Sequence, residues 1–244
     1  MSIEEKLTVV VPTSPIPSHP STSLIEQTLW SVRYHLPKVR ILIQCDGVRP
    51  EQEHFRSRYE EYKTNLATVL RQSFPNAEMR AADQFLHQAA MYRKFRPSTP
   101  LLLYVEHDLA FFQDPIDFAG IIKTVEAGEV NLMRIHYWSK ILDEHKHLML
   151  DTEPRLSQFG VPYIRTVQYS QHPHVARADF YDRLLSNYSP ECRTMIETKA
   201  YALVVNAPWE EWKCAIYAPE GNMRRLHHLH GRQEEPKWEE GFIF

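Results

Sequence analysis

The chain has 244 residues, enough for one large domain, and its hydrophobic content of 43% can support an extensive core. Basic and acidic residues nearly balance, 28 against 31, which argues against a nucleic-acid-binding protein that relies on a broad basic face. The 7 glycines form no G-x-x-x-x-G-K-[ST] or G-x-G-x-x-G string, so a P-loop or Rossmann nucleotide site lacks its main support.

The cysteine spacing and the hydropathy of the chain indicate the cellular compartment of the protein. Cys45, Cys192 and Cys214 lie far apart and form no C-x-x-C pair, so we expect neither a disulfide framework nor a zinc ribbon. The apolar run at residues 7–11 is too short for a signal peptide or a membrane span. We therefore expect a cytoplasmic protein without a transmembrane segment, which is still compatible with peripheral contact with a membrane.

Alternating strand and helix patterns predict an α/β fold for the first part of the chain. Residues 7–11 are β-branched and apolar, as in a buried strand, and Pro12 ends the run. Ser23 and Glu26 form a capping box for the helix that follows. Further strands are expected at residues 39–44, 77–80 and 130–136, and further helices from Pro50, Asp83 and Asp114.

The run at residues 101–105 is typical of a strand buried on both faces of a parallel sheet. Two carboxylates, Glu106 and Asp108, follow it with His107 between them. If the chain stays extended there, both carboxylates point to the same side. Such a pair at a strand end can bind one hard divalent cation, which can in turn hold a diphosphate. The alternative is a pair of solvated charges where the strand leaves the core.

Two further polar features precede or follow this strand. Asp46 closes the second predicted strand, at the edge where open α/β sheets bind ligands, and it can contact a nucleoside or simply form an Asp-Gly turn. Near the other end of the chain lie His227, His228 and His230. In an extended segment His228 and His230 face the same side, so one of them can supply an imidazole to a metal at Asp108. Separate structural or surface roles are the alternative.

From about residue 137 the periodicity weakens. Strands are expected at residues 163–168 and 214–218, and helices at residues 179–185 and 194–205. Residues 170–177 read as a polar loop, in which His172, His174 and Arg177 can form hydrogen bonds to a sugar or an acceptor. Trp209 can offer its ring face to a sugar, although aromatic residues more often belong to a core.

A general base is the remaining chemical group to find. Glu197 lies near a predicted helix start with apolar neighbours, which can raise the pKa of a carboxylate and suit it to that task. An exposed helix charge is the alternative. Glu191 and Asp179 are the other candidates for the base.

Taken together, these features resemble the nucleotide-sugar-dependent glycosyltransferases of the GT-A fold, and are similar to glycosyltransferase family 2. Residues 9–13 are similar to the family's opening strand and V-I-P-T turn, and residues 29–33 to its next helix. Residues 45–47 resemble the family's acidic end of strand two, and residues 105–108 stand where its D-x-D motif would be. His230 matches the histidine that completes the metal site in many members.

The resemblance implies a GT-A-like three-layer sandwich of the α/β class, with a mostly parallel central sheet and helices on both faces. It implies one compact catalytic domain, in which residues 1–136 bind the nucleotide sugar and residues 137–244 bind the acceptor and form a C-terminal tail. The reaction would move a sugar from a nucleotide-diphospho-sugar to a hydroxyl of a glycan or another acceptor, with Mn²⁺ or Mg²⁺ on the diphosphate.

The resemblance also implies roles for single residues. Glu197 would be the base of an inverting enzyme. The residues expected at the donor are Pro12, Thr13, Asp46, Arg93, Glu106 and His107. The residues expected at the metal are Asp108, Glu106 and His230. The residues expected at the acceptor are His172, His174, Arg177 and Trp209. The chain departs from the family in having Glu106 as the first acid of the motif and in lacking a clean E-D pair for the base.

Two other functions remain open at this point. A nucleotidyltransferase on a similar sheet would make a nucleotide sugar, but it would need a glycine- and arginine-rich loop after the first strand, which residues 13–20 are not. A non-catalytic carbohydrate-binding protein of the same fold would need neither a metal nor a nucleotide.

Overall fold

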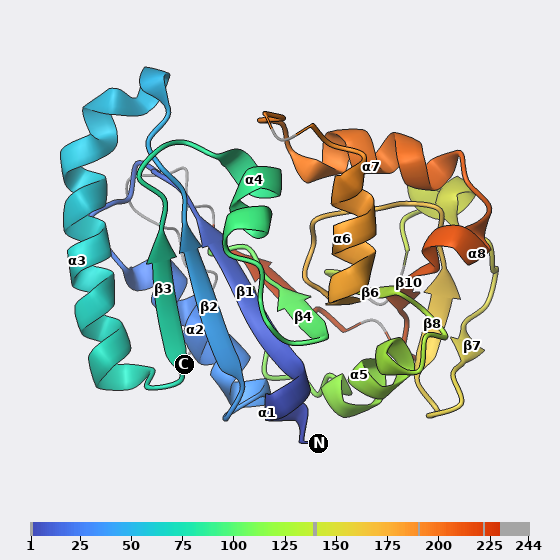
Figure 1. The fold of residues 1–244 in the computed structure, drawn as a ribbon. Coiled ribbons are helices and arrows are strands. Elements are labelled where there is room, and N and C mark those ends of the chain that lie inside the picture. Colours follow the sequence, from blue (N-terminus) through green and yellow to red (C-terminus); the bar gives the residue numbers. More distant parts are fainter. Residues whose placement is uncertain (1, 139–140, 190, 222, 230–244) are drawn as a thin grey trace.

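A central sheet organises the residues that the structure, a computed structural model, describes: 2–138, 141–189, 191–221 and 223–229. Its strands are β1 (Leu7–Thr13), β2 (Arg40–Cys45), β3 (Ala77–Ala81), β4 (Leu101–Tyr104), β6 (Leu132–Ile135), β7 (Arg155–Leu156), β8 (Pro162–Arg165), β9 (His174–Arg177) and β10 (Cys214–Tyr217). They lie in the order β3-β2-β1-β4-β9-β6-β10-β8-β7, and most run parallel (Figure 1). The antiparallel β9 lies between β4 and β6.

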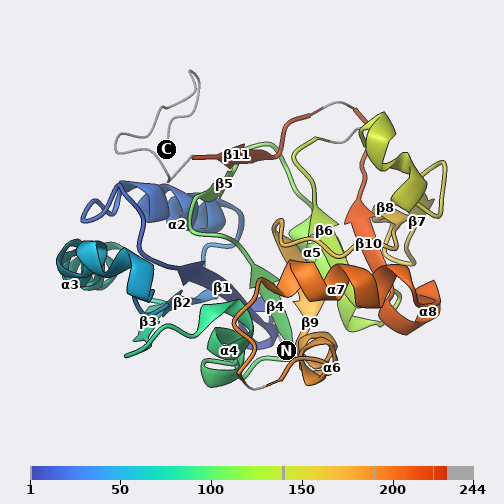
Figure 2. The same ribbon diagram turned by 90° about the horizontal axis from the view of Figure 1, so that it is seen from above.

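Helices cover both faces of this sheet (Figures 1 and 2). One face packs against α2 (Ser23–His35), α3 (Arg56–Ser73) and α5 (Phe118–Glu126). The other packs against α4 (His87–Lys94), α6 (Ala178–Ser186) and α7 (Ile196–Val205). The short helical elements are α1 (Ile3–Lys6), α8 (Trp209–Trp212) and the 3₁₀ segments η1 (Pro50–Phe55) and η2 (Asp143–Leu148). The predicted three-layer α/β architecture with a mostly parallel sheet is therefore confirmed.

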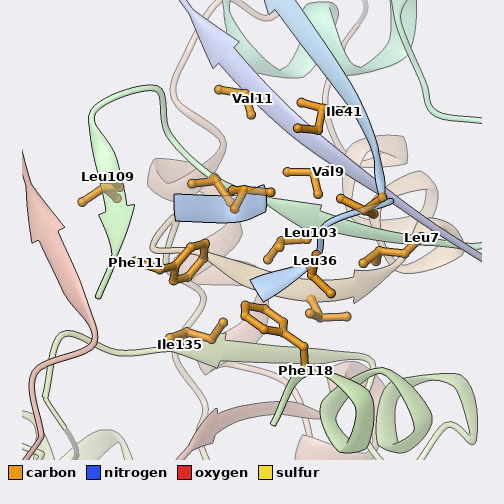
Figure 3. Close-up of a cluster of buried hydrophobic side chains, with 14 of the residues drawn as sticks. Leu7, Val9, Val11, Leu36, Ile41, Leu103, Leu109, Phe111, Phe118 and Ile135 are labelled. Carbon is orange, nitrogen blue, oxygen red and sulfur yellow. The ribbon is translucent and has the colours of Figure 1, made fainter. Parts of the chain in front are cut away.

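The strand period of two explains why apolar runs form the centre of the sheet. In β1, Val9 and Val11 point into the larger of two cores, whereas Val10 points into the other. In β4, Leu103 and Tyr104 divide between the two cores in the same way. Figure 3 shows the larger core between the sheet and its helices. A strand that must fill two cores needs apolar residues at every position, which is the pattern that the sequence carries.

Several helices begin at residues other than those that the capping residues in the sequence suggest. Helix α2 follows Thr22 rather than beginning after Ser23, and Thr22 Oγ1 donates a hydrogen bond of 2.5 Å to Glu26. Helix α4 begins at His87, four residues beyond the predicted cap. Helix α5 begins after Asp117, whose side chain accepts a 2.8 Å hydrogen bond from the amide of Gly120. The predicted starts of these helices differ from the observed ones because a short polar side chain marks only a potential cap. Packing decides which of the potential caps is used.

The prediction of a polar loop at residues 170–177 is wrong for the second half of this segment. Residues 174–177 form β9, which is hydrogen bonded on both sides in the middle of the sheet. The strand has only two apolar residues, Val175 and Ala176, and polar residues at both ends, so it lacks the long apolar run of its neighbours.

The prediction of an extended chain from Glu106 to Asp108 is also wrong. A turn follows β4, with the amide of Leu109 donating to the carbonyl of Glu106 at 3.1 Å. The chain then forms β5 (Leu109–Phe111), which pairs antiparallel with β11 (Leu226–His228) and lies beside α2 (Figure 2). This turn directs Asp108 toward the far end of the chain.

Among the described residues, every helix is too short or too polar for a membrane span.

Candidate functional site

The candidate site lies at one edge of the sheet, where the parallel strands β1, β2, β4 and β6 end and the antiparallel β9 begins. Polar residues follow each strand end because the chain leaves the core there. In open α/β sheets this edge is the usual place for a ligand.

At the centre of this edge, Asp108 and His228 meet. His228 Nε2 forms a hydrogen bond of 3.1 Å to Asp108 Oδ2. The backbone supports this contact, because β11 places His228 opposite Leu109 and the amide of Leu229 donates to the carbonyl of Asp108 at 2.8 Å. The Asp108 side chain is 16% exposed and that of His228 43% exposed, so the pair is accessible from solvent. His227 points the other way, into the interior, and stacks on Phe112.

The electrostatic environment keeps Asp108 ionised. Burial alone would raise the pKa of this carboxyl, but the nearby imidazoles of His107 and His228 outweigh it and hold the pKa well below its usual value. Glu106 lies close by, since both carboxylates help to raise the pKa of Tyr137, although burial is the larger cause of its value of about 12. The charges of both carboxylates therefore act on Tyr137.

Two of the predicted metal ligands, Asp108 and Glu106, lie within the described residues, and the third, His230, lies outside them. In the part of the chain that is described, no group of three or more His, Cys, Asp or Glu residues is arranged to hold a metal ion. Asp108 and His228 are in direct contact here.

A second group of side chains surrounds this pair on the β6 and β9 side. The ring of His172 lies 4.9 Å from that of Tyr137 and 5.8 Å from that of His136, measured between centroids. Burial lowers the pKa of His172 to about 3, and the charges of Arg134 and His228 act in the same direction. His172 is thus the predicted acceptor residue that lies at the site. Arg134, His136 and Tyr137 are additional residues that we did not predict, although a single arginine inside the apolar strand β6 was a visible signal.

The proposed base, Glu197, lies in the first turn of α7 and is partly buried. Its charge acts on Arg134, Tyr104 and Tyr169, which lie on the face of the sheet that α7 covers. Glu197 therefore lies on the same side of the sheet as Arg134 and near the carboxyl end of β4.

On the donor side, Asp46 holds a loop in place. Its carboxylate accepts hydrogen bonds from the amides of Gly47 and Leu86 at 2.8 Å each, and from that of His87 at 3.0 Å. A Cβ atom at Gly47 would lie 2.2 Å from the backbone of Gln84, so only glycine permits this close approach. The Asp-Gly pair thus joins β2 to the segment before α4, and these contacts use both carboxylate oxygens of Asp46.

Thr13 and His107 also lie near this edge. The Thr13 side chain is buried under α3, 3.4 Å from the hydroxyl of Tyr62, and Pro12 precedes it in β1. The carbonyl of His107 accepts a 2.9 Å hydrogen bond from Thr28, and the buried Nε2 of His107 has no hydrogen-bond partner among the described residues.

Four predicted site residues have other surroundings. The guanidinium of Arg93 donates to the backbone carbonyls of residues 185, 188 and 189, at the end of α6. His174 is fully buried, with both ring nitrogens in hydrogen bonds. Arg177 pairs with Asp179 at the opposite end of β9. Trp209 donates to the carbonyl of Cys214 at the start of β10, on that same opposite edge. We do not carry these four residues into the proposed site.

Buried and partly buried histidines should make the protein sensitive to mild acid. Burial lowers the pKa of His19 and His172 to about 3, and that of His136 and His174 to about 4. Unfolded histidines take up a proton near pH 6.5, so between these values the unfolded state binds more protons. The free energy of unfolding should therefore fall as the pH falls from 6.5 toward 4, by about 1.4 kcal/mol per pH unit for each histidine.

Urea unfolding between pH 7 and pH 4 checks this expectation. His172→Asn should reduce the slope of the free energy of unfolding against pH by about 1.4 kcal/mol per pH unit, the contribution of one proton. The control is the same substitution at the exposed His147, which should leave this slope unaltered. An identical slope in the wild type and in His172→Asn would contradict the burial of a neutral His172.

Comparison with known proteins identifies the fold. No protein-family model and no curated protein sequence matches the chain. Among solved structures, S. aureus TarS 1–349 is similar, with 12% identity, a TM-score of 0.53 and coverage of 89% of this chain and 59% of that one. The same fragment in complex with UDP gives 11% identity and a TM-score of 0.54 over the same shares of the two chains.

GalNAc-T7 with UDP, GalNAc and Mn²⁺ is similar at 11% identity and a TM-score of 0.58, over 89% of this chain and 43% of that one. TarS and GalNAc-T7 are both glycosyltransferases of the GT-A type, so the chain has a GT-A fold, as the resemblance implied. The chain spans less than two thirds of the length of either neighbour.

Proposed function

We propose that the protein transfers a sugar from a nucleotide-diphospho-sugar to an acceptor hydroxyl, with a divalent cation on the diphosphate. The observation that carries the proposal is the 3.1 Å contact between Asp108 and His228, which joins residues 120 positions apart at the ligand-binding edge of a GT-A fold. An ionised carboxylate and an imidazole brought together at this edge can bind a divalent cation.

The residues present fit a divalent cation. Asp108 and His228 would hold it, with Glu106 close to the same region. Two protein ligands suffice for Mg²⁺ or Mn²⁺ when the substrate phosphates and waters complete the shell. When bound, the cation would offset the charge that develops on the leaving diphosphate. The GalNAc-T7 structure, which contains UDP and Mn²⁺, supports this assignment by analogy of fold.

For the acceptor, Glu197 is the base that we propose, in an inverting reaction. It lies close enough to Arg134 and Tyr104 for its charge to act on both. A carboxylate at this place can take the proton from an acceptor hydroxyl as the hydroxyl attacks the donor. His172 would contact the acceptor.

For the donor, we propose that the nucleoside lies over the ends of β1 and β2, near Pro12 and Thr13. Asp46 would act there by holding the segment before α4, because its oxygens already accept backbone hydrogen bonds. Glu106 and His107 would lie between the nucleoside and Asp108. We further propose that residues 1–136 supply the donor site and residues 137–244 most of the acceptor site.

Isothermal titration calorimetry with UDP tests the proposed function. We expect Mn²⁺ to tighten UDP binding to the wild type by at least about tenfold, which is about 1.4 kcal/mol. The control is the same titration with Ca²⁺, whose larger and more flexible coordination suits a diphosphate site less well. Binding of a glycan without binding of any nucleoside diphosphate would instead favour the carbohydrate-binding alternative. Release of diphosphate from UTP plus a sugar phosphate would favour the nucleotidyltransferase.

A further inference from the structure

Arg134 is a buried cation in an apolar strand. It lies in β6 and is only 4% exposed. Leu132, two residues earlier on the same side of the strand, packs into the core beneath α6 and α7, so the Arg134 side chain lies on that face as well. Burial lowers the pKa of Arg134 to about 10, which leaves the guanidinium charged at neutral pH.

The hydrogen bonds of this guanidinium are incomplete. Nη1 and Nη2 donate to Gln168 Oε1 at 3.2 and 3.3 Å, and the buried Nε has no hydrogen-bond partner among the described residues. Within that part of the chain, no carboxylate forms an ion pair with Arg134. Glu197 is the carboxylate whose charge acts on it, from beyond the distance of a salt bridge. A buried charge that faces an amide rather than a carboxylate is costly to keep, so a missing anion would explain it.

Two other buried polar atoms near Arg134 lack partners. Both belong to the turn that leads into β9, and they are Gln171 Oε1 and His172 Nδ1. Gln171 Nε2 hydrogen bonds to the hydroxyl of Tyr104 at 3.4 Å, at the carboxyl end of β4. In the sheet, Arg134 pairs with His174, two residues from His172, and its charge lowers the pKa of His172. Three open polar atoms therefore share one corner of the sheet edge, beside the Asp108–His228 pair.

The donors at this corner suit an anion. A guanidinium matches carboxylate and phosphate oxygens in charge and geometry, and a neutral imidazole can add an N–H donor. Amide nitrogen and oxygen are interchangeable in position, so Gln171 can turn its NH₂ toward a ligand while its oxygen accepts from Tyr104. Neutral hydroxyls would satisfy the hydrogen bonds but would leave the charge of Arg134 uncompensated.

We propose that Arg134, with Gln171 and His172, binds an anionic substituent, a carboxylate or phosphate, on one of the two sugars in the reaction. This inference rests on the proposed function and names the class of its substrate. Either the transferred sugar or the acceptor sugar can carry the anion. The diphosphate is a separate anion, which belongs with Asp108 two strands away across β9.

Calorimetry on the wild type makes the first test, and it needs no variant. In the donor arm, UDP-glucuronate is compared with UDP-glucose in the presence of Mn²⁺. In the acceptor arm, free glucuronate is compared with glucose on protein saturated with UDP and Mn²⁺. We expect the acidic sugar to bind at least about tenfold more tightly in one arm, and that arm identifies the source of the anion. No preference in either arm would overturn the proposal.

Variants then assign the preference to this corner. Arg134→Met should abolish the preference for the acidic sugar and leave the affinity for UDP within about twofold. Arg93→Met, which removes an arginine that contacts only backbone carbonyls in the described region, is the matched control and should keep the preference. If Arg134→Met does not fold, His172→Asn should weaken the preference severalfold. A preference that survives in the folded variants would overturn the proposal, and so would an equal loss of affinity for UDP alone.

The two proposals fail separately. Normal UDP binding without an acidic preference would overturn only the role of Arg134. Absence of binding of any nucleoside diphosphate would overturn the proposed transferase. Titration of inorganic phosphate into the wild type and Arg134→Met would then still report whether the corner binds an anion.

Discussion

Asp108→Asn is expected to remove the effect of Mn²⁺ on UDP binding and to lower sugar transfer by about 10³-fold. Several kcal/mol of charge stabilisation at the diphosphate would be lost with the carboxylate, and about 1.4 kcal/mol corresponds to each factor of ten. The substitution preserves the size of the side chain and its ability to form a hydrogen bond with His228 Nε2, so the fold of the turn should persist. Calorimetry with and without Mn²⁺ and a transfer assay with a labelled donor measure the two effects.

The matched control is Asp179→Asn. Asp179 is also ion-paired, with Arg177, but it lies at the start of α6 on the opposite edge of the sheet. This variant should retain the Mn²⁺ effect and transfer within about twofold of the wild type, because an exposed ion pair contributes at most about 1 kcal/mol. If Asp108→Asn still bound UDP more tightly with Mn²⁺, the Asp108–His228 pair would not be the metal site.

Glu197→Gln is expected to lower kcat by about 10²–10⁴-fold, the usual contribution of a general base. The amide cannot accept the proton of the acceptor hydroxyl, although it keeps the shape of the side chain at the start of α7. The KM for the donor should change little, since Glu197 would act on the acceptor. Steady-state kinetics with varied donor and acceptor separates these effects.

Glu191→Gln tests one of the two other candidates for the base, and Asp179→Asn above tests the second. Glu191 is exposed and precedes α7 by five residues. Its substitution should leave kcat within about twofold of the wild-type value, as expected for a surface change away from the reacting atoms. A large loss of kcat in Glu191→Gln together with a normal Glu197→Gln enzyme would transfer the role of base to Glu191.

The sheet shows which local signals in the sequence were reliable. Strands β1, β2 and β4 were predicted within two residues at each end, because each must fill a core on both faces. The helices α6 and α7 were also predicted nearly in full from their apolar faces. Strand β9 was missed, since its few residues are held by neighbours from distant parts of the chain rather than by an apolar run of its own.

In the candidate site, too, some features follow from the local sequence and others depend on contacts between distant segments. That carboxylates follow the central strand could be read from residues 101–108, because polar residues collect where a buried strand ends. The sequence could not show which imidazole meets Asp108, because the strand period of two places His228 and His230 on the same side. The pairing of β5 with β11 brings His228 to Asp108. Arg93, His174, Arg177 and Trp209 had suitable chemistry for a site, but the packing of the sheet gave them other partners.

By itself, the sequence determined the α/β class, the positions of the long buried strands and the acidic end of β4. These depend on local patterns of apolar and polar residues, which act over a few positions. The tertiary structure alone decided that His172, Arg134 and His228 gather around that acidic end. Their meeting depends on strand order and register, which are set by packing between segments more than 100 residues apart in some cases, such as the 120 positions between Asp108 and His228.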